Sequence, residues 1–172
     1  MTGKTAPSRW AYFDTSALVK RYVQEPGRRE VLQLLRRYDF VASAVLPVEL
    51  GGALRRRVAE GTLDASRLPG ILTRVAADRA YWTLVAVGTD VLTAAEMLVT
   101  KHPLRALDAI HVASARLFAD RVTTPALLFV SADKRQTEAA AAIGLAPKYI
   151  AWNTPARQPT LGCLVATSWR SL

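Results

Sequence analysis

The stretch "YFDTSALVKRY", Tyr12 to Tyr22, contains the junction on which the prediction of the fold depends. It joins an apolar run that begins at Trp10 to a carboxylate, Asp14, and then to apolar positions with helical spacing. This order predicts a buried strand that ends at Asp14 and passes directly into a helix. An aspartate at such a junction either caps the first helical turn or binds a ligand at the end of the strand. Taken alone, the stretch favours the cap.

The rest of the chain alternates between short apolar runs and amphipathic stretches. We expect further strands at 40–42, 83–87, 126–130 and 147–151. We expect a short helix between Asp14 and Glu25, and further helices at 28–38, 44–59, 66–79, 89–100, 104–119 and 134–143. Strands joined by helical crossovers form parallel sheets covered on both faces. The predicted fold class is therefore α/β, with a central parallel sheet of four to five strands flanked by helices on both faces.

Length and composition restrict the class of protein. The 172 residues suffice for one domain with a substantial core. We expect that domain at 10–152, after a flexible leader at 1–9 and before a tail of unknown structure at 153–172. No apolar run approaches the roughly 18 residues that span a bilayer, and the leader lacks the apolar segment of a secretory signal. A cytoplasmic protein without a membrane partner is therefore expected.

The charge and the few cysteine and histidine residues restrict the chemistry. One cysteine, Cys163, excludes an internal disulfide, and with only two histidines there is no Cys/His zinc site. The net charge of +9 comes mostly from arginine and favours a polyanionic partner such as nucleic acid. Each arginine cluster alone is also typical of a solvated helix face.

Four acidic residues lie where a common site is expected. Asp133 follows the apolar run 126–130 as Asp14 follows the first run, and ligands bind at this edge of parallel sheets. Glu49 and Asp108 lie beside apolar positions of predicted helices, where an unpaired charge is costly. Four converging acids would raise one another's pKa unless a cation lay among them. Carboxylate oxygens favour Mg²⁺ or Mn²⁺, so the predicted chemistry is metal-assisted phosphodiester hydrolysis.

Each acid also has a purely structural interpretation. Asp14 and Asp133 are suitable helix caps. Glu49 is placed to pair with Arg56, and Asp108 is placed to interact with the macrodipole in an early turn of its helix. The sequence leaves these alternatives open at this point.

Four stretches resemble the acidic motifs of the PIN-domain nucleases, above all the VapC-type toxins of bacterial toxin–antitoxin pairs. In chain order they are "YFDTSALVKRY", "SAVLPVELGGAL", "LRALDAIHVASA" and "FVSADKRQTEAA", and the resemblance extends from Trp10 to about Trp152. It implies that the catalytic, metal-binding acids are Asp14, Glu49, Asp108 and Asp133. It also implies that Ser16 and Ser131 are polar groups that support these acids.

The resemblance implies an Mg²⁺- or Mn²⁺-dependent endoribonuclease that cuts a structured RNA, such as a transfer RNA or ribosomal RNA stem-loop. The implied partners are the RNA, a cognate VapB-type antitoxin and a second copy of the chain in a homodimer. Lys20 and Arg105 are candidates for contacts with RNA phosphates. His111, three residues after Asp108, is expected to be a hydrogen-bonded core residue, because metal-bound water needs no protein base.

Two other classes remain as alternatives. A phosphatase on a similar sheet is disfavoured, because its aspartyl nucleophile usually has a second aspartate two residues later and position 16 is serine. An inactive nucleic-acid-binding module would be expected to lack at least one acid, whereas all four are present.

The sequence also predicts a surface for the antitoxin. The first and third predicted helices contain more apolar positions than a thin covering of the sheet requires, so part of them is expected to form a groove for an amphipathic helix. These positions are Leu18, Val19, Tyr22, Val23, Leu46, Leu50 and Leu54. An arginine of the antitoxin would be attracted to the four acids.

Overall fold

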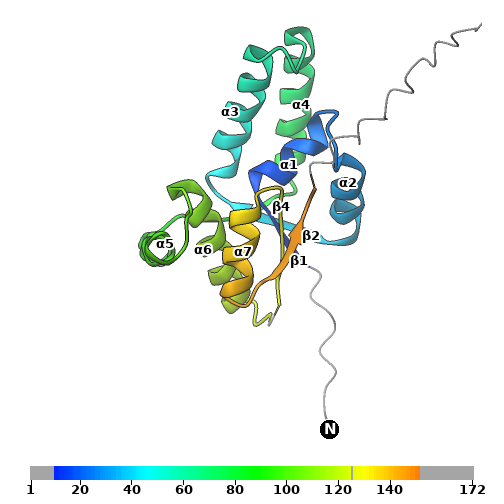
Figure 1. Ribbon diagram of the computed structural model, residues 1–172. Coiled ribbons are helices and arrows are strands. Elements are labelled where there is room, and N and C mark those ends of the chain that lie inside the picture. The colour runs from blue at the N-terminus through cyan, green and yellow to red at the C-terminus, as the bar shows by residue number, and fades with distance from the viewer. Residues whose placement is uncertain (1–9, 125, 152–172) are drawn as a thin grey trace, which may run out of the picture.

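The computed structural model describes residues 10–124 and 126–151, so the predicted leader and tail lie outside the described residues. In this part of the chain five parallel strands form one sheet in the order β3-β2-β1-β4-β5 (Figure 1). They are β1 (Trp10–Phe13), β2 (Asp39–Ser43), β3 (Thr83–Val85), β4 (Leu128–Ser131) and β5 (Ala146–Tyr149). The predicted α/β fold with a parallel sheet is confirmed.

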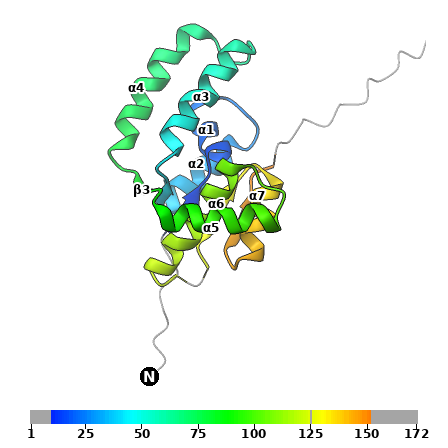
Figure 2. The same ribbon diagram turned by 90° about the vertical axis from the view of Figure 1, so that its left-hand side faces the viewer.

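Seven α-helices and one 3₁₀ turn connect the strands in the described residues. They are α1 (Thr15–Tyr22), α2 (Arg28–Arg37), α3 (Leu46–Ala59), the 3₁₀ turn η1 (Ala65–Arg67), α4 (Leu68–Arg79), α5 (Thr89–Lys101), α6 (Ala106–Arg121) and α7 (Lys134–Ala142). Helices α5, α6 and α7 gather on one side of the sheet and α1 and α2 on the other (Figure 1). The hairpin of α3 and α4 extends past the edge of the sheet (Figure 2). No helix in the described part of the chain is long and apolar enough to cross a membrane.

The junction of β1 and α1 forms as the sequence predicts. Asp14 ends the strand and caps α1, because its side chain accepts a hydrogen bond from the backbone N–H of Ser16. Asp133 does the same between β4 and α7. Strands β1 and β4 are neighbours, with Phe13 beside Val130 in the register. The two aspartates therefore emerge side by side at the carboxyl edge of the sheet.

Two predicted helices begin later than expected because their first residues have other backbone partners. The helix expected from Ala44 begins at Leu46, since the Ala44 N–H is still bound to the Val85 carbonyl at 2.9 Å and extends the sheet. The helix expected from Leu104 begins at Ala106, after an extended residue at Arg105. Both helices keep their predicted acids in or near the first turn.

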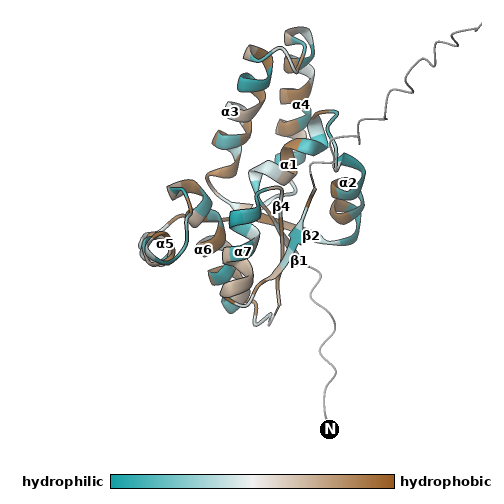
Figure 3. Ribbon diagram, viewed as in Figure 1, coloured by the Kyte–Doolittle hydropathy of each residue, from teal (hydrophilic) through white to brown (hydrophobic). Residues whose placement is uncertain are grey.

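The predicted apolar groove on the first and third helices is wrong. All seven of its residues are buried in one cluster that also contains Leu63 and Leu68, at the start of the α4 segment. The ribbons of α3 and α4 both contain hydrophobic residues, coloured brown in Figure 3. Because α4 packs against α3, this apolar surface is the interior of the α1–α3–α4 unit and offers no groove.

Candidate active site

The four predicted acids line one cavity of about 530 Å³ at the carboxyl edge of the sheet. Asp14 and Asp133 come from the two strand–helix junctions, Glu49 from α3 and Asp108 from α6. The structure thus brings together residues that are up to 119 positions apart, from 14 to 133. The remaining lining includes Arg56, Arg57, Arg105 and Gln136.

Asp14 is only 2% exposed and is held through one of its two carboxylate oxygens. Oδ2 accepts hydrogen bonds from the Ser16 N–H at 3.1 Å, from the Ser16 hydroxyl and from the Ser131 hydroxyl at 3.0 Å. Oδ1 lies 3.7 Å from Nε2 of His111. Asp14 therefore acts as a helix cap through Oδ2 and keeps Oδ1 for other partners.

Ser16 and Ser131 connect the ends of β1 and β4. The Ser16 hydroxyl also accepts from the Ala132 N–H at 2.9 Å, and the Ser131 hydroxyl accepts from the Asp133 N–H at 3.0 Å. The two serines thereby set the distance between the two strand-end aspartates. They lie where the resemblance placed polar supporting groups.

Glu49 is bound to Thr15 and His111. Its Oε2 accepts from the Thr15 hydroxyl at 2.7 Å and lies 2.5 Å from Nε2 of His111. Burial raises the pKa of Glu49, but the hydrogen bond and the charge of His111 lower this pKa by more, so the net shift is downward. The expected alternative, a pair with Arg56, is not the contact that forms.

His111 is 1% exposed and hydrogen-bonded, as predicted for a core histidine. Its Nδ1 lies 2.9 Å from the Tyr12 hydroxyl, and its Nε2 faces the two acids Asp14 and Glu49. Burial lowers the pKa of His111, but the Glu49 hydrogen bond and the charges of Asp14, Glu49 and Asp108 outweigh it and raise the pKa. The contact of His111 with Asp14 and Glu49 was not predicted from the sequence. The spacing of three residues between Asp108 and His111, which places these two side chains on one side of α6, is the signal that could have indicated it.

Asp108 is hydrogen-bonded through both of its carboxylate oxygens. Its Oδ2 accepts from the Arg105 N–H at 3.3 Å in the first turn of α6, and its Oδ1 accepts from the Gln136 amide at 2.9 Å. Burial raises the pKa of Asp108, the Arg105 N–H lowers it, and the charges of Asp14 and Asp133 raise it further. Asp14 and Asp133 are therefore both close enough to Asp108 to repel its charge.

Asp133 is turned toward Arg135, two residues later. Arg135 donates to both carboxylate oxygens, at 3.4 and 2.9 Å, and this contact lowers the pKa of Asp133. The neighbouring Gln136 has a buried Oε1 without a hydrogen-bond partner among the described residues. Arg135 and Gln136 are not among the residues predicted from the sequence, although their positions just after Asp133, in the first turn of α7, indicate proximity to the site.

The donor chemistry of the cavity fits a hard divalent cation. Four carboxylates supply oxygen ligands, and the repulsion that raises the pKa of Asp108 is the interaction that a cation would relieve. Within residues 10–124 and 126–151, no three His, Cys, Asp or Glu side chains are arranged closely enough to hold a metal ion. Glu49 is bound to His111 and Asp133 to Arg135, so a metal ion would compete with these partners for the two carboxylates.

The two predicted RNA contacts lie in different surroundings. Arg105 is exposed at the cavity, where it is accessible to a phosphate. Lys20 is 1% exposed, and its ammonium lies 3.4 Å from a carboxylate oxygen of Glu25. Burial lowers the pKa of Lys20. The expectation that Lys20 contacts RNA is corrected accordingly, because its charge is used inside the protein.

Comparison with known families agrees with this arrangement. Residues 11–142, most of the chain, match the PIN domain family. The chain belongs to the PIN-domain family. PIN domains are typically metal-dependent nucleases that use Mg²⁺ or Mn²⁺. The matched span contains all four acids of the cavity. No curated protein matches the chain.

Proposed function

We propose that this PIN-domain protein is an Mg²⁺- or Mn²⁺-dependent endoribonuclease and the toxin of a type II toxin–antitoxin pair. One observation carries the proposal: Asp14, Glu49, Asp108 and Asp133, from four separate elements, line one cavity. Helix capping accounts for the positions of Asp14 and Asp133 but does not require Glu49 and Asp108 beside them. Burial, together with repulsion by Asp14 and Asp133, raises the pKa of Asp108, and a strained acid of this kind in a cavity supports a binding or catalytic role.

The four acids would hold the ion, which when bound supplies an activated water and neutralises charge on the phosphate. Ser16 and Ser131 orient Asp14, and Thr15 and His111 orient Glu49. Arg56 and Arg105, both exposed at the cavity, are available to bind phosphates of the RNA backbone. The chain thus positions both the ligands of the ion and the backbone of the substrate.

Three features support RNA and an antitoxin as partners in the cytoplasm. The four motifs resemble those of VapC-type toxins, and the net charge of +9 suits a polyanion. Val48 and Leu107, which are 79% and 46% exposed, line the acidic cavity. Apolar groups beside a cluster of acids fit an antitoxin segment that contributes both apolar residues and an arginine. A homodimer of the chain belongs to the same proposal.

The two alternatives have less support. At position 16, where a phosphatase would need a second aspartate, the serine hydroxyl donates to Asp14. An inactive binding module has no need for four acids in one cavity, and all four lie there.

Cleavage of a structured RNA by the purified chain tests the nuclease proposal. Transfer RNA and ribosomal RNA stem-loops, labelled at one end, are incubated with Mg²⁺, with Mn²⁺ or with EDTA. We expect discrete cleavage products with either ion and none with EDTA. Equal cleavage in EDTA, or no cleavage of any RNA with either ion, would refute the proposal.

Growth measurements test the toxin proposal separately. Expression of the chain should arrest growth, and co-expression of the adjacent reading frame should restore it. The Asp108→Asn variant, expressed to the same level, should be tolerated. If the wild-type chain is tolerated at high expression, the toxin proposal fails even where cleavage of RNA is observed.

A further inference from the structure

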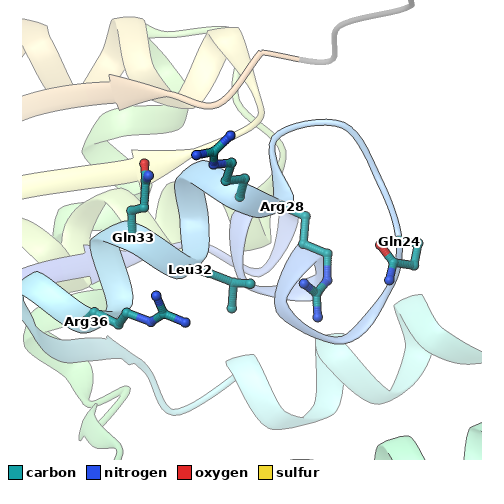
Figure 4. A pocket seen from close by; sticks show the side chains of 6 residues that line it. Gln24, Arg28, Leu32, Gln33 and Arg36 are labelled. Carbon is teal, nitrogen blue, oxygen red and sulfur yellow. The ribbon is translucent and has the colours of Figure 1, made fainter.

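Five arginines line two neighbouring pockets away from the four acids. The first, of about 460 Å³, is lined by Gln24, Arg28, Arg29, Leu32, Gln33 and Arg36 (Figure 4). The second, of about 470 Å³, is lined by Tyr22, Gln24, Arg28, Arg67, Gly70, Ile71 and Arg74. Gln24 and Arg28 line both, so the two pockets are adjacent, and we call the pair, which extends from α2 to the η1–α4 segment, the arginine groove.

Few charges of the arginine groove are neutralised by the residues that the structure describes, although the charges of Arg74 and Arg67 help to lower the pKa of Asp78 and Asp64. Among the residues that the structure describes, Arg29, Arg36, Arg67 and Arg74 form no ion pair. The nearby carboxylate of Asp78 is already bound by Arg21 at 2.7 and 2.8 Å and by the Tyr22 hydroxyl at 2.8 Å. A concave surface with several unpaired charges of one sign focuses a positive potential toward solvent.

Arg28, at the junction of the two pockets, has a donor without an acceptor. Its Nη2 donates to the Arg21 carbonyl at 3.3 Å, whereas its Nε is buried without a hydrogen-bond partner in the described part of the chain. A buried N–H without an acceptor is costly and rare in native proteins. A phosphate oxygen in the groove would supply the acceptor, and a guanidinium group matches phosphate geometry.

The groove lies close to the acidic cavity along α1. Val19 lines the cavity and Tyr22 lines the groove, and the two residues are three positions apart on one side of the helix. They are separated by about 4.5 Å along the helix axis. The cavity and the groove are therefore neighbours along α1.

We propose that the arginine groove binds the sugar–phosphate backbone of the RNA substrate beyond the cleavage site. This proposal rests on the proposed ribonuclease function. The guanidinium groups hold phosphates, and the amides of Gln24 and Gln33 are available to bases or sugar hydroxyls. The groove favours substrates long enough to reach it from the four acids.

A matched pair of triple variants tests the groove. The groove variant carries Arg29→Gln, Arg36→Gln and Arg74→Gln, and the control variant carries Arg79→Gln, Lys101→Gln and Arg121→Gln. All six side chains are exposed, and the control positions line neither the groove nor the cavity. Each variant loses three positive charges, and thermal melting checks that both remain folded.

The measurement is the affinity for labelled oligouridylate of about 20 nucleotides, in EDTA, as a function of salt concentration. Each lost phosphate contact lowers the slope of log K against log salt by about 0.7 for a single strand, so the groove variant should lose about 2. At 0.1 M salt this corresponds to roughly 100-fold weaker binding. The control variant should keep most of the wild-type slope. With a trinucleotide, the difference in affinity between the groove and control variants should be much smaller than with the longer oligouridylate probe.

Equal slopes for the groove and control variants would overturn the proposal. So would a groove that binds an oligoglutamate peptide but not RNA, since its partner would then be an acidic protein. RNA cleavage by the wild-type chain is measured in parallel. If the wild-type chain cleaves RNA but the groove and control variants have equal salt slopes, only the proposal for the groove is refuted. If the salt slope changes only in the groove variant but the wild-type chain cleaves no RNA, the nuclease proposal is refuted and the groove remains a nucleic-acid-binding site.

Discussion

The substitution Asp14→Asn separates helix capping from metal binding. All three hydrogen bonds that Asp14 accepts go to Oδ2, from the Ser16 N–H, the Ser16 hydroxyl and the Ser131 hydroxyl. The Oδ1 of an asparagine in this place would accept the same bonds, and asparagine caps helices as well as aspartate does. Only the second oxygen, 3.7 Å from Nε2 of His111, would be replaced by an amide nitrogen.

The expected loss of folding stability is small. A hydrogen bond to a charged acceptor contributes about 1.5–3 kcal/mol and a neutral one about 0.5–1.5, so the three bonds together lose about 3–4 kcal/mol. Removal of the Asp14 charge also removes part of the repulsion that raises the pKa of Asp108. The net decrease in the free energy of unfolding should be about 1–2 kcal/mol. The Asp14→Ala substitution removes the cap and the acceptor of the buried Ser131 hydroxyl. It should lower the free energy of unfolding by about 3–4 kcal/mol.

The expected loss of metal binding and cleavage is large. A metal ion contributes several kcal/mol to transition-state stabilisation, so RNA cleavage by the Asn variant should fall at least about 100-fold. Mg²⁺ at ten times its Kd should stabilise the wild-type protein by about 1.4 kcal/mol in urea unfolding, and the Asn variant much less.

Asp64→Asn is the matched control. Asp64 also caps a helical turn, with its side chain accepting from the Ser66 N–H at 2.8 Å, but it lies outside the acidic cavity. This variant should keep wild-type cleavage and wild-type stabilisation by Mg²⁺. If Asp14→Asn also cleaved RNA at the wild-type rate and gained the same stability from Mg²⁺, Asp14 would be only a cap, and the proposed ion site would lose its central ligand.

Three further substitutions test the surroundings of the site. His111→Ala removes the partner of Glu49 and of the Tyr12 hydroxyl and leaves a cavity, so urea unfolding should show a loss of about 2–4 kcal/mol, together with slower RNA cleavage. Leu50→Ala, in the interior of the α1–α3–α4 unit, should cost about 2–5 kcal/mol by the same measurement; a cost below 1 kcal/mol would mean that an open groove exists there after all. Hydrogen bonds from Arg21 hold the pKa of Asp78 below its usual value of 3.8. The stabilisation by Asp78 is therefore present above that value and lost as the pH falls through the lowered pKa, so Asp78→Asn should unfold with a weaker dependence on acid below about pH 4.

Local patterns were sufficient to predict the elements and the candidate acids. Strands and helices differ in the period of their apolar residues, and that period is visible within a few positions of sequence. An aspartate between an apolar run and a helical pattern marks a strand end, so Asp14 and Asp133 could be placed at one edge of a parallel sheet. Glu49 and Asp108 could be selected because a charge beside apolar helix positions is unusual.

The partners of each side chain depended on the tertiary structure, because they come from distant parts of the chain. The sequence showed apolar positions on the first and third helices, but only the packing of α4 made them interior. Lys20 is buried because the chain after α1 returns Glu25 to it, and Glu49 binds His111 rather than Arg56 because α6 packs across the strand ends. The arginine groove likewise combines α2 with the η1–α4 segment. Sequence periodicity determines which face of an element is apolar or charged, whereas the contacts of that face depend on long-range packing that no local pattern contains.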